Sequence, residues 1–464
     1  MSDSASSLRA GRTPRKRSTG LVLANRAIGA ALQRGVVVVV ARTADARTLG
    51  GYLAFSAAVR LIGTAVSFGE PWVALRWISQ SDEMGNPVKS RIYLFGSVRA
   101  VTRNFLVAMA LGIPAAILVI GRTDLGPKAL VLIPLGVLGV GGYAYTDLGV
   151  DALKARSMVQ RGVFLDFSLT PLCVITWAIV ANATGGSAGI AGLAVAQTVG
   201  ALASAVASFV ILRRDHRRRF GAIDPGATKV HVRTPSERRT VRSFGATSLL
   251  TTAAPTLPLV LLPLVMSLAD VGRVGAAIRL TSVPGVLIVG LSSVFAPRFA
   301  RLAIANDRSG LHDALRESQR WVMGLYLPFA IAFIVFPERL VPLLGPDFAQ
   351  TAVALRILGI GQLVNAMTGL APMLLTMCNT EAFVLAATGA SVVVMGGASL
   401  AAGARWGVVG AALGYAASVA SRNVMIYVKA NQVIRSGPLV SETAAAELQG
   451  VAPVRTGAPG SGDG

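Results

Sequence analysis

Charged residues are scarce in this sequence, and acidic residues are the scarcest. Only 14% of the 464 residues are Asp, Glu, Lys or Arg, whereas a soluble protein averages about 25%. Hydrophobic residues make up 53% and the mean hydropathy is +0.61, which excludes a soluble enzyme and a disordered chain. The net charge is nevertheless +22. In such an apolar chain we expect the cations to lie on anionic membrane lipids rather than on a nucleic acid.

Cysteine and histidine are also few. Cys173 and Cys378 both fall within or beside apolar segments, so no disulfide framework or cysteine-rich metal site is expected. The three histidines, His216, His231 and His312, lie far apart in expected loops and suggest no metal site. The sequence contains no Walker loop or nucleotide-binding glycine fingerprint. We therefore expect neither an enzyme nor a cofactor.

Long apolar runs are what the sequence has in abundance. A helix that crosses a bilayer needs about 20 mostly apolar residues. The sequence therefore predicts an all-α integral membrane protein with about twelve transmembrane helices. The expected spans are 20–41, 51–74, 100–120, 129–147, 163–183, 189–212, 243–267, 275–297, 321–336, 350–377, 383–402 and 408–428.

The distribution of basic residues predicts the domain organisation and the orientation. Residues 1–19 form a basic tail, 213–242 a basic linker and 434–464 a tail of disordered composition, and these flank two six-span bundles, 20–212 and 243–433. If both termini are cytoplasmic, thirty Lys and Arg residues lie on that side and seven outside. Because cytoplasmic loops carry the excess of Lys and Arg, this is the orientation we expect.

The two halves resemble each other weakly. Gly189–Ala194 matches Gly407–Ala412 at an offset of 218, and the stretch ending at Arg76 matches the one ending at Arg298 at an offset of 222. Many transporters contain such repeats. Because six spans is an even number, both halves should point the same way across the membrane. Small residues that permit close helix packing are a simpler explanation for the glycine pairs.

Seven arginines fall within the expected spans, where a charge is unfavourable. Arg34 and Arg60 lie about 10 Å and about 13 Å deep, and Arg279 maps by the offset of 222 to position 57, close to Arg60. These three could converge on a central cavity and bind a phosphate or pyrophosphate group. Alternatively, each could pair with a helix carbonyl or extend to the membrane surface. The other four lie near span ends, where that extension suffices: Arg26, Arg103, Arg356 and Arg422.

Prolines and hydroxyl residues are concentrated in the seventh and eighth spans. Pro255, Pro258 and Pro284 should bend or break their helices, so we expect them to act in gating. The neighbouring threonine and serine hydroxyls suit a moving gate, although hydroxyls in helices more commonly bond to their own backbone.

Several short motifs occur in the order and spacing of one transporter family. Leu49–Tyr52, Asp270–Leu280, Phe295–Ala300, Leu343–Ala349 and Trp406–Ala412 together resemble the polysaccharide flippases of the multidrug/oligosaccharidyl-lipid/polysaccharide exporter superfamily, over about residues 18–433. The resemblance implies two six-helix bundles that form a V around a central cavity. It also implies alternating access, by which an undecaprenyl-pyrophosphate-linked oligosaccharide crosses the bacterial plasma membrane.

Arg279-Leu280-Thr281-Ser282-Val283-Pro284 is similar to the eighth span of the related lipid II flippases. That likeness implies that Arg279 faces the lipid-linked pyrophosphate, with Arg34 and Arg60 as approximate counterparts of other cavity arginines. Twelve spans rather than fourteen favour the polysaccharide branch. A polysaccharide polymerase or glycosyltransferases are the protein partners that this function would involve.

Two other functions stay open. A cation-coupled multidrug antiporter of the same superfamily would need an acidic residue at cavity depth, and spans seven and eight contain none. Glu70, Asp147 and Asp166 are expected near cytoplasmic ends, where they would pair with nearby arginines. The third possibility is a membrane scaffold that docks polysaccharide synthases through its basic linker and has no transport activity.

Overall fold

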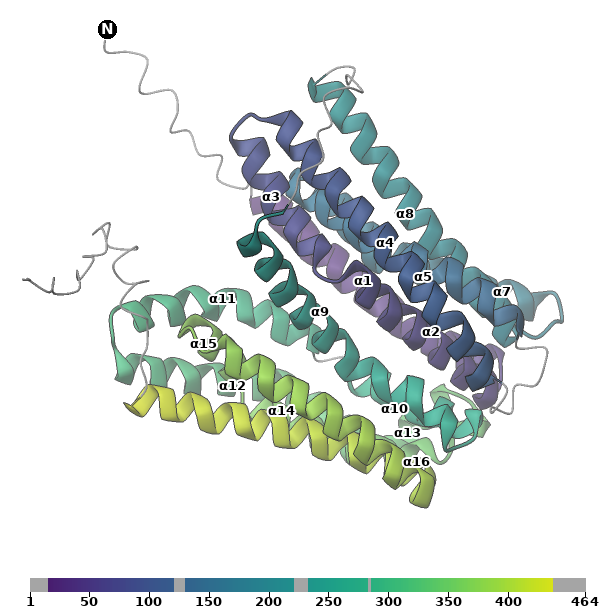
Figure 1. The fold of residues 1–464 in the computed structure, drawn as a ribbon. Helices are drawn as coiled ribbons and strands as arrows, with labels where there is room; N and C mark the ends of the chain where they lie inside the picture. Colours follow the sequence, from purple (N-terminus) through teal and green to yellow (C-terminus); the bar gives the residue numbers. More distant parts are fainter. Residues whose placement is uncertain (1–15, 121–129, 221–232, 283–284, 437–464) are drawn as a thin grey trace, which may run out of the picture.

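The computed structural model describes residues 16–120, 130–220, 233–282 and 285–436 (Figure 1). These residues are helical almost throughout, and none of them lies in a β-strand. The expected tails 1–19 and 434–464 lie mostly outside the described residues, as does the middle of the expected linker. The all-α fold is confirmed.

The described residues of the first bundle form eight helices, some of which meet at short breaks within one expected span. The helices are α1 (Lys16–Thr43), α2 (Ala46–Ser67), α3 (Glu70–Glu83), α4 (Pro87–Ile120), α5 (Leu132–Ala155), α6 (Val159–Phe167), α7 (Leu169–Ala183) and α8 (Ile190–Phe220).

The second bundle follows the same plan, with α10 and α11 or α14 and α15 forming broken spans. Its helices are α9 (Pro235–Leu261), α10 (Leu268–Thr281), α11 (Gly285–Ile304), α12 (Arg308–Ile334), α13 (Pro337–Leu340), α14 (Thr351–Met367), α15 (Ala371–Met377) and α16 (Glu381–Ser436), with short 3-10 turns after α9 and α13. Helix α16 holds two expected spans, because Gly407 interrupts it with a non-helical φ of 54°.

Helices occupy each of the twelve expected spans. By length and composition alone, seven described helices are apolar enough to cross a membrane, or eight if a bent pair counts as one span. The doubled helix α16 accounts for part of this difference, because it enters that count once. The protein is a multi-pass membrane protein.

Two of the expected boundaries are wrong. The second span ends at Ser67 rather than residue 74, because Phe68 and Gly69 adopt positive φ values of 26° and 80° and a new helix begins at Glu70. The sixth span was expected to end at residue 212, whereas α8 continues to Phe220, so the first part of the expected linker 213–242 is helical.

The two bundles lie side by side in Figure 1, and they approach each other most closely near α10. We call the end that carries α3, the C-terminus of α8 and the N-terminus of α9 the basic end. We call the opposite end, where α1 turns into α2, the short-loop end.

Helices α2 and α10 hold the bundles together at the short-loop end. A methyl group at Gly50 would overlap the carbonyl of Leu268, and one at Gly272 would overlap the carbonyl of Ala46. Only glycine permits this backbone approach. Gly272 and Leu268 are the equivalents of Gly50 and Ala46 at the offset of 222, so the contact is reciprocal and follows the sequence repeat.

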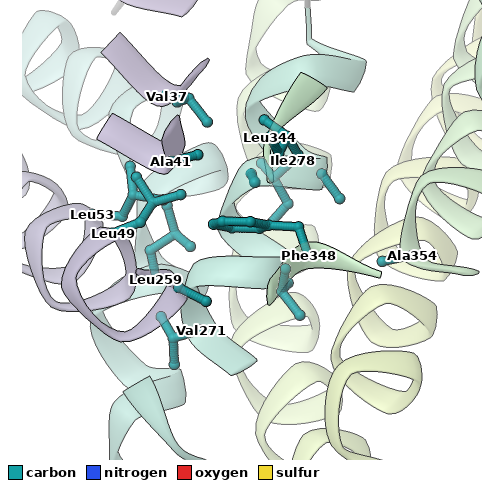
Figure 2. Packing of buried hydrophobic residues seen from close by; sticks show 14 of the residues in the cluster. Val37, Ala41, Leu49, Leu53, Leu259, Val271, Ile278, Leu344, Phe348 and Ala354 are labelled. Atoms are coloured by element: carbon teal, nitrogen blue, oxygen red, sulfur yellow. The ribbon is translucent and has the colours of Figure 1, made fainter. Parts of the chain in front are cut away.

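A buried apolar cluster seals the same end (Figure 2). It combines side chains from both bundles, including Ala41 and Leu49 from the first and Val271, Leu344 and Phe348 from the second. Phe348 is fully buried. Because the surrounding lipid is itself apolar, tight packing rather than escape from water holds such a contact within the bilayer. The structure is therefore closed at the short-loop end.

Candidate functional site

A cavity of about 330 Å³ lies between α1, α2, α5, α6, α7, α9 and α10. It has the size of a small-molecule site, and we call it the first cavity. Arg60 and Arg279, which come from different halves of the chain, are both among its lining residues. The other lining residues are Gln33, Val36, Val37, Tyr52, Leu53, Ser56, Tyr143, Asp166, Phe167, Thr170, Pro171, Thr252, Pro255 and Thr256.

Arg60 projects from α2 toward α5 and is fixed there by two partners. Its Nη1 atom donates a hydrogen bond to Oδ1 of Asp147 at 2.9 Å. Its guanidinium carbon lies 5.2 Å from the centre of the Tyr143 ring, a cation–π distance. The Arg60 side chain is 35% exposed and Asp147 is 14% exposed. The guanidinium therefore keeps donors toward the cavity while one donor is engaged by the carboxylate.

Unlike Arg60, Arg279 has no counter-ion among the described residues. It lies in the last turn of α10, and in the described part of the chain its guanidinium has no hydrogen-bond or salt-bridge partner. It does interact electrostatically with Tyr52 and Tyr143 across the cavity. An unpaired cation in a polar cavity is well placed to bind an anionic ligand.

Arg34 lies beside the first cavity rather than among its lining residues. Its Nη1 donates to the Ala30 carbonyl at 2.8 Å, and its Nη2 donates to the Ser282 carbonyl at 3.2 Å. The pairing with helix carbonyls is the alternative that the sequence left open. Arg34 is still close enough to Arg279 for the two charges to interact, so it adds to the positive potential near the cavity.

Two of the three expected gating prolines lie in α9, which remains one helix through both of them. Pro255 lines the first cavity and Pro258 is buried one turn later. Each proline removes one intrahelical hydrogen bond. The nearby hydroxyls of Thr251 and Thr256 donate to carbonyls within the same helix. The third proline, Pro284, lies outside the described residues.

Asp147 and Asp166 are site residues that the sequence analysis placed at span ends. Helix α5 continues to Ala155, eight residues beyond the expected boundary at Asp147, so this carboxylate lies two turns inside the helix. Asp166 lines the first cavity and interacts electrostatically with Arg60. Only the true length of α5 could have shown the position of Asp147. Among the described residues, no group of three His, Cys, Asp or Glu side chains is arranged to hold a metal ion.

At the basic end, a salt bridge joins the two halves of the chain. Nη1 of Arg233 donates to Oε1 of Glu70 and Nη2 donates to Oε2, each at 2.6 Å. Glu70 begins α3, and Arg233 comes two residues before α9. The rings of Trp72 and Phe244 stack nearby with centroids 6.0 Å apart. The first half of α9 is thus attached to the first bundle.

The second half of α9 packs on the second bundle instead. Leu257 and Leu261 lie against Gly396 of α16, and Leu262 lies against Gly403. Leu250 also lies against α16, at Gly389, so Pro255 and Pro258 both fall within the stretch of α9 that contacts the second bundle. Helix α9 therefore connects the bundles, and its proline turn borders the first cavity.

The fold is shared with solved transporters of one superfamily. The inward-facing conformation of a multidrug resistance MATE family transporter of the MOP superfamily matches with a TM-score of 0.71 and 13% identity, covering 90% of this chain and 96% of that one. The inward closed conformation of lipid II flippase MurJ matches with a TM-score of 0.62 and 12% identity over 90% of each chain. The outward-facing conformation of a multidrug resistance MATE family transporter matches with a TM-score of 0.58 and 13% identity, covering 92% of this chain and 96% of that one.

Sequence comparison identifies one family, whereas the fold is common to several kinds of transporter. No curated protein matches this chain by sequence. A family model does match, that of the lipid II flippase MurJ, over residues 158–449. This match covers more than half of the chain, from α6 through the whole second bundle. The chain belongs to the lipid II flippase MurJ family of membrane transporters.

Proposed function

We propose that the protein flips an undecaprenyl-pyrophosphate-linked oligosaccharide across the plasma membrane by alternating access, for polysaccharide assembly. The pyrophosphate binds in the first cavity between Arg60 and Arg279, and Arg34 contributes to the positive potential. The polyprenyl tail remains in the bilayer. The basic end faces the cytoplasm, so the closed short-loop end makes this conformation inward-facing.

The observation that carries the proposal is the guanidinium of Arg279. It lines the first cavity and has no partner in the part of the chain that the structure describes. Intramembrane charges of this kind usually face a substrate pathway. A guanidinium forms paired hydrogen bonds with phosphate oxygens. A ligand with a pyrophosphate group therefore supplies the missing partner.

The test is transport by the purified full chain in liposomes. Undecaprenyl-pyrophosphate-linked oligosaccharide is supplied on one face, and its appearance on the other is followed with a membrane-impermeant glycosidase or lectin. Arg279→Gln should reduce the rate at least tenfold without loss of protein from the membrane. Arg356→Gln is the matched control, because Arg356 pairs with Glu338 on an exposed surface. Normal transport by Arg279→Gln would refute the role of the first cavity.

The glycan is tested in the same liposomes. Lipid II and a polysaccharide repeat unit on the same carrier are compared at equal concentration. Faster transport of the repeat unit supports the polysaccharide assignment, in which a polymerase or glycosyltransferases would act with this protein. Faster transport of lipid II would show that lipid II, the substrate for which the family is named, is the preferred substrate. The proposed pyrophosphate site would remain the same.

A cation-coupled antiporter is a second candidate, and one observation favours it. Asp147 and Asp166 lie beside Arg60 in the first bundle, so acidic residues do occur at the cavity. An antiporter of cationic drugs would be inhibited by Asp166→Asn and would tolerate Arg279→Gln. A flippase would instead lose transport in Arg279→Gln. The two variants therefore distinguish the two functions.

A further inference from the structure

A second cavity of about 340 Å³ lies within the second bundle and is also lined by α9. Pro255 lines both cavities, so the two cavities adjoin at this residue. The lining of the second cavity comes from α9, α14, α15 and both halves of α16. It consists of Thr251, Ala254, Pro255, Gln362, Asn365, Pro372, Val384, Thr388, Met395, Tyr415, Val419, Arg422, Asn423 and Ile426.

The linings of the two cavities correspond in part through the repeat. Three lining residues of the second cavity match lining residues of the first at the offset of 222, the same offset as at the Gly50–Gly272 contact. Pro255 corresponds to Gln33, Asn365 to Tyr143, and Thr388 to Asp166. Part of the lining of the second cavity, three of its fourteen residues, therefore occupies repeat positions that also line the first.

The charge of the second cavity differs from that of the first. Arg60 faces Asp147 and Asp166 in the first cavity, whereas no lining residue of the second is acidic. Its one ionic group is Arg422. The Nε atom of Arg422 is buried without a hydrogen-bond partner, and within the described ranges the rest of its guanidinium also lacks a salt bridge. The expectation that Arg422 simply extends to the membrane surface is wrong.

Neutral polar groups surround this cation. The hydroxyl of Thr251 donates to the Thr247 carbonyl and that of Thr388 to the Val384 carbonyl, so their oxygens can accept hydrogen bonds from a ligand. Gln362 accepts a hydrogen bond from Asn365 at 3.1 Å and keeps its own amide donor. Tyr415 interacts electrostatically with both Arg422 and Arg279, which links the two cavities.

We propose that the second cavity binds a carboxylate on the glycan part of the lipid-linked substrate, with Arg422 as the counter-ion. This deepens the proposed function, because the pyrophosphate of the same molecule occupies the first cavity. One guanidinium offers a pair of donors that match one carboxylate, and a single negative charge balances a single cation. The amides and hydroxyl oxygens match the alternating donors and acceptors of sugar hydroxyls.

The experiment compares three ligands in nanodiscs of neutral lipid: undecaprenyl pyrophosphate, its glucosyl derivative and its glucuronosyl derivative. The wild type should bind the glucuronosyl derivative about tenfold more tightly than the glucosyl one, a factor that corresponds to one charge-assisted pair of about 1.4 kcal/mol. Arg422→Gln should bind both derivatives equally and bind undecaprenyl pyrophosphate as the wild type does. Arg422→Lys should retain part of the preference, because lysine keeps the positive charge but lacks the paired N–H donors of the guanidinium.

Other variants separate this proposal from the proposed function. Arg279→Gln should weaken binding of all three ligands and keep the preference for glucuronate. Equal binding of the two derivatives by the wild type would overturn the carboxylate site and leave the flippase intact. Failure of the wild type to bind undecaprenyl pyrophosphate would overturn the proposed function. Loss of affinity for undecaprenyl pyrophosphate in Arg422→Gln would place the pyrophosphate, and not a carboxylate, at Arg422.

Two further measurements test whether Arg422 binds inorganic phosphate or lipid head groups instead of a sugar carboxylate. Free sodium glucuronate should raise the Tm of the detergent-solubilised wild type, whereas glucose and the Arg422→Gln variant should show no rise. A larger rise with inorganic phosphate would overturn the preference for carboxylate. Replacing the neutral nanodisc lipid with phosphatidylglycerol should leave the tenfold preference in place. Its disappearance would assign the cavity to phospholipid head groups instead.

Discussion

Arg60 on α2 donates a hydrogen bond to Asp147 on α5 at 2.9 Å, across 87 residues of sequence. Asp147 is therefore both the partner that positions Arg60 and a competitor for any anion that Arg60 binds. Asp166 adds a second negative charge nearby. Arg60, Asp147 and Asp166 together carry one net negative charge, so the attraction of the first cavity for anions depends on the unpaired Arg279, with Arg34 nearby.

A double-mutant cycle on this pair separates stability from function. Arg60→Gln leaves Asp147 buried without a cation, and Asp147→Asn leaves Arg60 without a counter-ion. Each should lower the free energy of unfolding in micelles, and the double variant should recover about 1–3 kcal/mol of coupling energy. Transport should stay low in the double variant, because in the proposed function Arg60 itself contacts the pyrophosphate. Additive losses of stability would show that the pair is not coupled.

The contact between Gly50 and Gly272 predicts how the short-loop end responds to a single methyl group. Gly50→Ala places that group against the Leu268 carbonyl, so the bundles must separate there and the open state should gain population. Cross-linking between cysteines at Arg42 and Leu343 reports on this, because Arg42 donates to the Leu343 carbonyl at 2.8 Å in the closed state.

Gly397→Ala is the control for that experiment, since a methyl group at Gly397 would meet no atom within 4 Å. Cross-linking should fall severalfold in Gly50→Ala and remain unchanged in Gly397→Ala, both in a background without the two native cysteines. Equal yields in the two variants would show that the backbone contact does not control closure.

The bidentate pair of Glu70 and Arg233 should be worth more than an exposed salt bridge. The Glu70 side chain is only 3% exposed, so Glu70→Gln should lower the free energy of unfolding by about 3 kcal/mol. The pair Glu338–Arg356 has side chains 59% and 44% exposed, and Glu338→Gln should change stability by less than about 1 kcal/mol. Chemical denaturation in micelles measures both values. Similar losses in the two variants would contradict a structural role for the buried pair.

Periodicity and hydropathy predicted the architecture because a bilayer imposes one helix length on every span. The predictions failed where a local conformation or a helix outside the bilayer decides the outcome. Phe68 and Gly69 end α2 through positive φ values, which hydropathy does not detect. The sequences around Arg76 and Arg298 predicted a repeat offset of 222 residues. Helices α2 and α10 begin at Ala46 and Leu268, which are also 222 residues apart.

The candidate site was predicted less completely than the fold. Depth in the membrane identified Arg60 and Arg279, which line one cavity, but depth cannot show which partner a long side chain reaches. Arg34 bonds to carbonyls, whereas Arg422, expected at the membrane surface, lines a cavity. Asp147 was expected to pair with an arginine, and it does, but its place beside the first cavity was missed because α5 extends past the apolar stretch that marked its span. Side-chain partners depend on helix rotation and crossing, which composition does not encode.

His216 predicts a pH dependence of stability at the basic end. It lies beyond the expected membrane span, in the final part of α8. Burial lowers its pKa, and the cations Arg156 and Arg91 lower it further, against the opposing effect of Asp82 and Asp215. Its ring Nδ1 lies 3.3 Å from Nη2 of Arg156. The folded protein therefore favours the neutral imidazole.

Because the folded pKa lies below the unfolded value of about 6.5, the unfolded state binds more protons as the pH falls. The stability is fully present above pH ~6.5 and decreases below it, by at most about 1.4 kcal/mol per pH unit. Thermal unfolding of the wild type between pH ~7.5 and ~5.5 should show this decrease, and His216→Gln should lack that part of it. A His216→Gln curve parallel to that of the wild type would show that protonation of another group destabilises the basic end.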